Sequence, residues 1–217
     1  MNSRIHYGQR KRGEMNTDAE MIQEYNDWYK RNPEKWSIEV RDRIAYDVIS
    51  EHVKEPVDIL DVGCGNGHTL LYLSKKFPNA KMYGLDISGE ALKLVKAKLP
   101  DATTYEDFIE TFATKKRFHV IVNEGTAEHF RDLHEGLKAM KNLLKKDGII
   151  YLEAPNNLAY SKGKHEYRRL EGGSRQYEWH LDRKEWEAVF KAVGLKVVKR
   201  YGFPKPQWGF VWVLSEA

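Results

Sequence analysis

The 217-residue chain is 41% hydrophobic and 12% aromatic, which suffices for one domain with a real core and excludes global disorder. Its single cysteine, Cys64, excludes an internal disulfide, and a net charge of +4, from 36 Lys and Arg against 32 Asp and Glu, does not by itself indicate a nucleic-acid partner. Because residues 1–16 lack the apolar centre of a signal peptide and no run approaches the roughly 20 apolar residues of a membrane helix, we expect a soluble cytoplasmic protein without a membrane partner.

The N-terminal quarter shows no strand pattern. Residues 1–15 include a short basic cluster and are expected to form a flexible basic tail. Residues 16–55 are expected to form a helical cap on the domain that follows, with Thr17 or Asp18 capping the first helix. Pro33 interrupts this helix and is well suited to begin the next one. One helix face carries Met21, Tyr25, Trp28 and Tyr29 at spacings of three and four.

From residue 56 to residue 217, strand-like and helix-like runs alternate. Strands are expected at 57–63, 81–87, 102–107, 118–123 and 148–155, and helices at 67–77, 89–99, 132–144 and 182–194. This alternation predicts an α/β domain whose parallel sheet is covered by helices on both faces. The last two strand-like runs, 195–203 and 208–217, are too close for a crossover helix, so the last strand should run antiparallel to its neighbour.

One long segment, residues 156–182, interrupts the alternation. It is rich in basic and aromatic side chains, and segments of this length are usually functional or disordered. It is predicted to be an insertion that covers an anionic or sugar-bearing substrate, and the alternative is a solvated loop. Tyr25, Trp28 and Trp36 could close the same pocket from the N-terminal side, or they could simply pack against the domain.

The stretch "DVGCGNG" ends the first expected strand and opens the first helix after it, where open α/β sheets bind ligands. Its glycines, Gly63, Gly65 and Gly67, are spaced G-x-G-x-G. A dinucleotide site needs G-x-G-x-x-G, and a phosphate-binding P-loop needs a longer loop followed by Lys. Asp61 is poorly placed beside a pyrophosphate, because like charges repel, and well placed beside an ammonium group.

A second acid, Asp86, ends the next expected strand. An acid at this spacing from the loop usually binds a ribose, because a carboxylate offers two acceptor oxygens to two hydroxyl groups. Together, the glycine loop, Asp61 and Asp86 indicate a nucleoside joined to an amino acid.

Four stretches in this order, "DILDVGCGNG", "GLDIS", "VNEGTAEHF" and "LLKKDGIIYLEAPN", resemble class I S-adenosylmethionine-dependent methyltransferases. The resemblance is strong over about residues 57–155. It implies a Rossmann-like fold: a seven-stranded, mostly parallel sheet with an antiparallel last strand and helices on both faces. It also implies a methyltransferase that uses S-adenosyl-L-methionine and releases S-adenosyl-L-homocysteine.

The same resemblance implies roles for individual residues. Asp61 and the backbone of Gly63, Gly65 and Gly67 would hold the methionine end, Asp86 the ribose, Ile87, Asp107 and Phe108 the adenine, and Asn123 and Glu124 the pocket near the methionine. An alternative for Asp107 is a helix cap before "FIETF".

The candidate catalytic residues are His129, in an "EHF" element resembling that of many small-molecule methyltransferases, and His180, just before the helix at 182–194. A histidine can serve as general base near neutral pH, although alignment of the acceptor with the methyl group does most of the work. Either histidine could instead have only a packing role. Some relatives bind a divalent metal through E-x-x-E-H. Here Gly125 replaces the first acid, so no metal is predicted.

The leading interpretation is therefore transfer of a methyl group to an oxygen or nitrogen of a small molecule. An RNA methyltransferase and a non-catalytic protein that binds the cofactor as a sensor are the alternatives. A dehydrogenase does not fit the glycine spacing. The acceptor and the oligomeric state are not indicated by the sequence.

Overall fold

The computed structural model describes residues 17–34, 39–55, 58–155, 165–169, 175–179, 181–202 and 209–217. The expected tail 1–15, Trp36 and His180 lie outside these residues. The helices are α1 (Asp18–Arg31), α2 (Glu39–His52), α3 (His68–Lys76), α4 (Gly89–Lys98), the short 3-10 helix η1 (Ala127–His129), α5 (Leu133–Asn142) and α6 (Arg183–Ala192). The strands are β1 (Asp58–Val62), β2 (Lys81–Asp86), β3 (Thr103–Glu106), β4 (Phe118–Glu124), β5 (Leu144–Ala154), β6 (His165–Arg169), β7 (Arg175–Trp179), β8 (Leu195–Gly202) and β9 (Phe210–Glu216).

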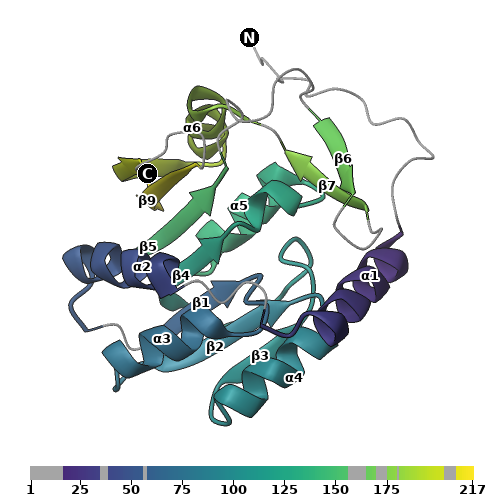
Figure 1. The fold of residues 1–217 in the computed structure, drawn as a ribbon. Coiled ribbons are helices and arrows are strands. Elements are labelled where there is room, and N and C mark those ends of the chain that lie inside the picture. The colour runs from purple at the N-terminus through teal and green to yellow at the C-terminus, as the bar shows by residue number, and fades with distance from the viewer. Residues whose placement is uncertain are drawn as a thin grey trace.

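Seven of these strands form one sheet in the order β3-β2-β1-β4-β5-β9-β8 (Figure 1). Strands β1 to β5 pair in parallel, and β9 is antiparallel to both β5 and β8. The predicted parallel sheet and its antiparallel last strand are thus confirmed. Among the described helices, none combines the length and the apolar composition needed to cross a membrane.

Helices cover both faces of the sheet. One apolar core joins α2, α3 and α4 to the sheet, and the other joins α5 and α6 to the opposite face. Ala45, Val48 and Ile49 of α2 are buried in the first core with Ile59 of β1, so α2 belongs to the layered domain itself. Helix α1 instead lies beside α4, at the right of Figure 1.

Local sequence signals predict two of the observed helix ends correctly and a third wrongly. Thr17 and Glu20 form a capping box at the start of α1, as one of the two caps considered. Gly194 follows α6 with a φ of 77°, as expected of a glycine that ends a helix. The prediction that Pro33 begins the second helix is wrong: Pro33 lies in a turn and α2 begins at Glu39.

Two boundaries near β5 also differ from the prediction. Helix α5 ends at Asn142, and β5 already begins at Leu144, because Phe118 and Leu144 pair before the irregularity in the β4–β5 register. Within the segment 156–182, β6 and β7 form an antiparallel ribbon separate from the main sheet. The indole nitrogen of Trp179 donates to the Phe130 carbonyl at 2.7 Å, which ties this ribbon to the segment after η1.

A charged cluster closes the end of the sheet remote from the glycine loop. Asp58 is 3% exposed, and its carboxylate lies 2.6 Å from the Lys116 ammonium and 2.8 Å from the Lys145 ammonium. Burial acts to raise the pKa of Asp58, but the two lysines outweigh burial and hold this pKa at about 2. The cluster therefore stabilises the starts of β1, β4 and β5.

Candidate functional site

The glycine loop joins β1 to α3 in a conformation that side chains rarely adopt. Gly63, Gly65 and Gly67 have φ values of 74°, 51° and 75°. A Cβ on Gly65 would lie 2.5 Å from the Tyr29 hydroxyl, and a Cβ on Gly63 would overlap the Thr126 side chain. The glycines are thus required by the backbone and by neighbouring side chains, as well as by any ligand that approaches the loop.

Gly67 has a different place from the other two. It precedes α3, and a Cβ there would lie 2.9 Å from Cγ2 of Val95 on α4. It does not line the cavity described below, so its predicted contact with a cofactor is not supported by its position.

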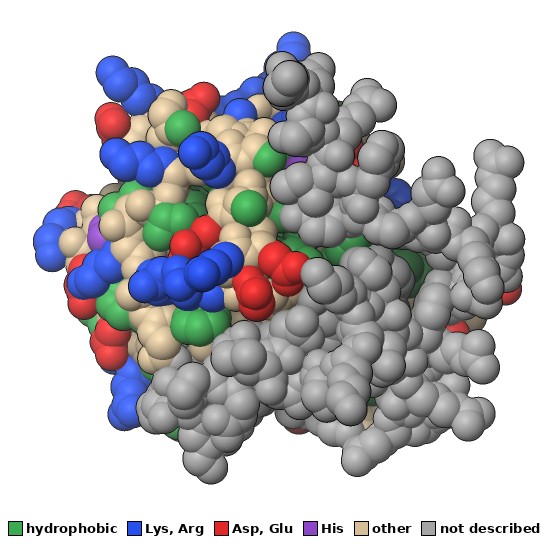
Figure 2. All heavy atoms as spheres, turned by 90° about the horizontal axis from the view of Figure 1, so that it is seen from above, with side chains coloured by type: hydrophobic (Ala, Val, Ile, Leu, Met, Phe, Trp, Pro, Cys, Tyr) green, Lys and Arg blue, Asp and Glu red, His purple; other side chains and the backbone are tan. Residues whose placement is uncertain are grey.

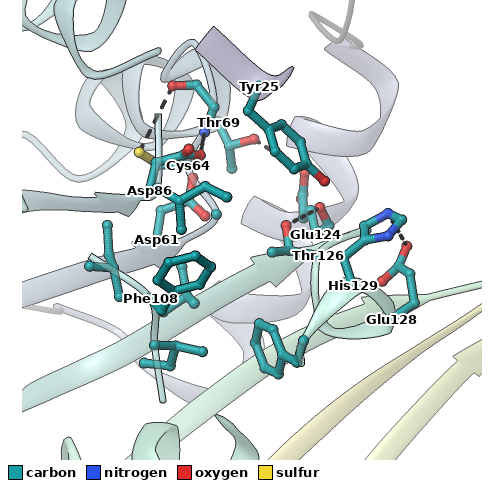
Figure 3. Close-up of a pocket in the computed structure, with 18 of the residues that line it drawn as sticks. Tyr25, Asp61, Cys64, Thr69, Asp86, Phe108, Glu124, Thr126, Glu128 and His129 are labelled. Carbon is teal, nitrogen blue, oxygen red and sulfur yellow. Dashed lines mark hydrogen bonds and ion pairs between the residues drawn. The ribbon is translucent and has the colours of Figure 1, made fainter. Parts of the chain in front are cut away.

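A cavity of about 380 Å³ opens beside this loop, at the carboxyl ends of the parallel strands (Figure 3). Its size is within the usual range for small-molecule sites. The predicted site residues that line it are Asp61, Gly63, Gly65, Asp86, Ile87, Asp107, Phe108, Glu124 and His129. Residues far apart in the sequence are therefore brought together as expected.

Asp86 is fixed by two backbone groups at the left of Figure 3. One carboxylate oxygen accepts from the Gly65 N–H and the other from the Ser88 N–H, both at 2.9 Å. Burial raises the pKa of Asp86 to about 6, against these hydrogen bonds, which lower it. Each oxygen keeps a second lone pair, so the carboxylate can still accept from a pair of hydroxyl groups.

Asp61 is 3% exposed at the floor of the cavity. Burial raises its pKa well above the usual range, and the nearby charges of Glu124, Asp86 and Asp42 add to this effect. A buried carboxyl group surrounded by other acids is stabilised by a cationic partner, which suits the predicted contact with an ammonium group.

Two predicted residues have clear structural roles. Asn123 does not line the cavity; its side chain is fully buried, donates to the Val62 carbonyl and accepts from the Ala127 N–H, both at 3.0 Å. Asp107 lines the cavity and also accepts from the Phe108 N–H at 2.8 Å and the Thr111 hydroxyl at 2.7 Å. Asp107 therefore caps a turn that begins at Phe108, and the expected helix after it is not formed. One of its oxygens is already engaged.

His129 marks the opposite end of the cavity from Asp86 (Figure 3). It lies in η1, and its Nε2 is 4.0 Å from the carboxylate of its neighbour Glu128. Tyr25 points into the cavity from α1. Arg131 pairs with Asp18 of α1, and its guanidinium lies 4.0 Å from the Phe108 ring centre.

Helix α1 covers the cavity through the face that the spacing predicted. Met21, Tyr25, Trp28 and Tyr29 all line it. Asn26 anchors the helix, because its side-chain oxygen accepts from the Ser88 hydroxyl at 2.7 Å and from the backbone of α4.

Sequence reasoning missed a group of polar residues on the Glu124 side of the cavity. They are Arg41, His68, Thr69 and Glu153. Arg41 of α2 binds the Glu153 carboxylate at 2.9 Å across 112 residues of sequence. Glu153 lies in the quoted stretch "LLKKDGIIYLEAPN" and the other three lie in none of the quoted stretches, so only the three-dimensional packing shows that the four line the cavity.

A family model described as "Methyltransferase domain" matches residues 20–200 of the chain. The chain is similar to a trans-aconitate 2-methyltransferase from Afipia carboxidovorans, with 27% identity over 61% of this chain and 52% of that protein. It is also similar to a demethylmenaquinone methyltransferase from Chlorobaculum parvum, with 34% identity over 48% of this chain and 43% of that protein. The chain spans about half the length of these curated relatives.

Solved structures show the same fold over almost the whole chain. An S-adenosylmethionine-dependent methyltransferase from Clostridium acetobutylicum matches with a TM-score of 0.67 and 16% identity, over 89% of this chain and 99% of that one. The sugar N-methyltransferase KedS8 from Streptoalloteichus matches with a TM-score of 0.70 and 17% identity, over 88% of this chain and 92% of that one. At these identities the likeness shows the fold alone, and it confirms the Rossmann-like fold predicted from the sequence.

Proposed function

The chain belongs to the family of methyltransferase domains, and from this premise we propose that it moves a methyl group from S-adenosylmethionine to an oxygen or nitrogen of a small molecule. The observation that carries the proposal is the charge of the cavity. Carboxylates outnumber guanidinium groups along its lining. The acids are Asp61, Asp86, Asp107, Glu110, Glu124, Glu128 and Glu153, and the guanidinium groups are Arg41 and Arg131. Such a cavity suits a ligand that carries both a sulfonium and an ammonium charge.

The arrangement of the lining supports one orientation of the cofactor. Asp86 would accept from the ribose hydroxyls, with Ile87 and Phe108 against the adenine. Asp61 would meet the ammonium group beside the backbone of the glycine loop. This orientation directs the reactive end of the ligand toward His129.

The bound cofactor supplies an already activated methyl group, so the chain has only to position the acceptor and remove a proton. His129 is the proposed acceptor of that proton, because it lies at the open end of the cavity and Glu128 can stabilise the imidazolium that forms. Helix α1 would exclude water above the site through its aromatic side chains. His180 remains a second candidate outside the described residues.

The acids of the described cavity also bear on the acceptor. They favour a neutral or cationic acceptor, such as a sugar hydroxyl or an amine, over an anion. The basic residues that led us to expect an anion lie in the segment 156–182, whose side chains are outside the description apart from Trp179, Leu181 and Asp182. Among the described residues on the face shown in Figure 2, Lys and Arg are intermixed with Asp and Glu and form no concentrated basic stripe of the kind that binds RNA.

Calorimetric titration with S-adenosylmethionine and S-adenosylhomocysteine tests the proposal. We expect wild-type protein to bind both ligands and the Asp86→Ala variant to lose at least tenfold in affinity. Asp101→Asn, which changes an exposed acid remote from the cavity, is the matched control and should bind like wild type. Thermal unfolding of the same samples separates lost binding from lost folding, and a folded wild type that binds neither ligand would sink the proposal.

A further inference from the structure

A chain of polar side chains runs from the cavity to the outer surface of α3. Thr69 stands at its centre: its hydroxyl oxygen lies 2.9 Å from Oδ1 of Asp42 and 3.1 Å from Oε2 of Glu124. The other oxygen of Asp42 is paired with Nδ1 of His68. Glu124, Thr69, Asp42 and His68, hereafter the polar relay, come from β4, α3 and α2.

The two ends of the polar relay differ in their surroundings. Glu124 faces the cavity, and its Oε1 is buried without a hydrogen-bond partner among the residues described. Asp42 is 2% exposed, whereas the His68 side chain is 28% exposed. His68 also borders a hollow on the outer face of α3, which it shares with Leu71, Tyr72, Lys75 and Lys76. The polar relay therefore connects a buried carboxyl group to solvent.

The hydrogen count at Thr69 points to a proton on one acid of the polar relay. A threonine hydroxyl has a single hydrogen, yet the Thr69 oxygen lies within hydrogen-bond distance of two carboxyl groups. Thr69 can donate fully to only one of them, and the second contact becomes a full hydrogen bond when that acid carries a proton and donates to Thr69. Asp42 pairs with His68 through its other oxygen, whereas Glu124 lies beside a further carboxylate, Glu153, so the proton is assigned to Glu124.

The charges around Glu124 agree with this assignment. Burial raises its pKa to about 8, and the neighbouring carboxylate of Glu153 contributes in the same direction. Arg41 opposes the effect, but its guanidinium is hydrogen-bonded to Glu153. The groups that face Glu124 are Arg41 and Asp42 from α2, Thr69 from α3, Asp61 from β1, and Tyr151 and Glu153 from β5.

We propose that Glu124 is protonated in the ligand-free protein and that a cationic ligand entering the cavity displaces this proton through Thr69 to the Asp42–His68 pair and on to water. The inference rests on the proposed function for the identity of that ligand. The Glu124 O–H bond breaks, Thr69 takes this proton while passing its own to Asp42, and the Asp42–His68 pair loses one proton to solvent. Glu124 gains one negative charge, and no oxidant or reductant is involved.

As a consequence, Glu124 is neutral in the empty cavity and becomes negatively charged when a cationic ligand binds. The empty cavity avoids one further buried anion among its other acids, while the occupied cavity provides a counter-ion. Cofactor binding should therefore release protons and tighten as the pH rises toward 8.

Infrared spectroscopy tests the proton on Glu124 without any ligand. At pH 7 the difference between the wild-type and Glu124→Gln spectra should contain the carbonyl stretch of one protonated carboxyl group, and this band should be absent from the same difference at pH 10. The pKa of Asp61 is also raised, so the band is read from this difference and not from either spectrum alone. Gln has the same shape and can still donate to Thr69, so the fold should be kept. Glu51→Gln, which changes a surface carboxylate whose pKa is lowered, first of all by its hydrogen bond to Lys199, is the matched control and should keep the band. A wild-type spectrum that does not differ from that of Glu124→Gln would overturn the inference.

Calorimetry of S-adenosylmethionine binding, repeated in buffers of different ionisation enthalpy, counts the protons released. From a free-protein pKa of about 8, wild type should release about 0.9 proton per ligand at pH 7 and about 0.1 at pH 9. Glu124→Gln should release about 0.9 proton fewer than wild type at pH 7. Equal release from both proteins would contradict the inference. Absence of binding to wild type would count against the proposed function, while the infrared result would still decide where the proton lies.

Discussion

Replacing Glu124 by Gln should change the way in which the stability of the ligand-free protein depends on pH. The structure raises the pKa of Glu124 from its ordinary 4.5 to about 8, so the folded state binds a proton that the unfolded state has already lost. Between these two values, each rise in pH therefore favours the unfolded wild type. The neutral Gln variant lacks this dependence.

The size of the effect follows from the two pKa values. At pH 6 the folded wild type keeps nearly one proton on Glu124, and at pH 9 it keeps about a tenth of one, whereas the unfolded chain keeps almost none at either pH. Integrating this difference from pH 6 to pH 9 gives a loss of about 3 kcal/mol in the free energy of unfolding of the wild type relative to Glu124→Gln. This figure is the contribution of Glu124 alone, because Asp61, Tyr151 and Glu153 interact with its charge. Groups that do not interact with Glu124, such as Asp58, contribute equally to both proteins.

Urea unfolding of both proteins at pH 6, 7, 8 and 9 measures this difference. The stability of Glu124→Gln relative to wild type should rise by about 1 kcal/mol per pH unit from pH 6 to pH 8 and by less than half of that from pH 8 to pH 9. Glu51→Gln should follow the wild type, because the pKa of Glu51 is lowered and this residue stays ionised throughout. Parallel curves for wild type and Glu124→Gln would refute the assignment of the raised pKa to Glu124.

Three further predictions concern the scaffold. Gly67→Ala should lower the free energy of unfolding by about 1–3 kcal/mol in urea denaturation, because φ is 75° and the new Cβ would lie 2.9 Å from Val95. Gly202→Ala, whose Cβ would meet nothing within 4 Å, should change stability by less than about 0.5 kcal/mol, and equal losses would contradict the strain argument. Asp58→Asn should lower the free energy of unfolding by about 2 kcal/mol at pH 7. Since the folded pKa of about 2 is below the ordinary 3.8, this difference from wild type should shrink as the pH falls through 3.8 to 2. A difference that does not vary with pH would exclude the ion pairs as its cause. Asn26→Ala should loosen α1 from α4 and speed hydrogen exchange in α1, with unchanged exchange in the central strands; uniform acceleration would indicate a global effect instead.

The layered fold was predictable because its cause is local and repeated. Each apolar run and each helix face recurs at its own period, and short connections leave few topologies open. The antiparallel last strand followed from the short link between β8 and β9. The start of α2 at Glu39 did not, because a proline that interrupts one helix does not by itself fix where the next helix begins.

The candidate site was predictable where a motif is contiguous. Asp61 and Asp86 follow from the ends of two strands, and both line the cavity. Asn123 was expected to line the pocket but does not, because its side chain, near the end of β4, is held by the Val62 carbonyl and the Ala127 N–H. The polar relay and the Arg41–Glu153 pair join segments that are distant in sequence, so no residue spacing in the sequence predicts them.

The glycine loop shows how one short motif can meet several demands together. Three groups from neighbouring elements lie close to the glycines of the loop. They are the Thr126 side chain after β4, the Tyr29 hydroxyl of α1, and Val95 of α4. Because Tyr29 belongs to the helix that covers the cavity, a side chain on Gly65 would force the Tyr29 ring to move from its place over the loop. The glycine loop therefore lies where the sheet, helix α1 and the cavity meet. Its glycines are needed for this packing even before a cofactor binds.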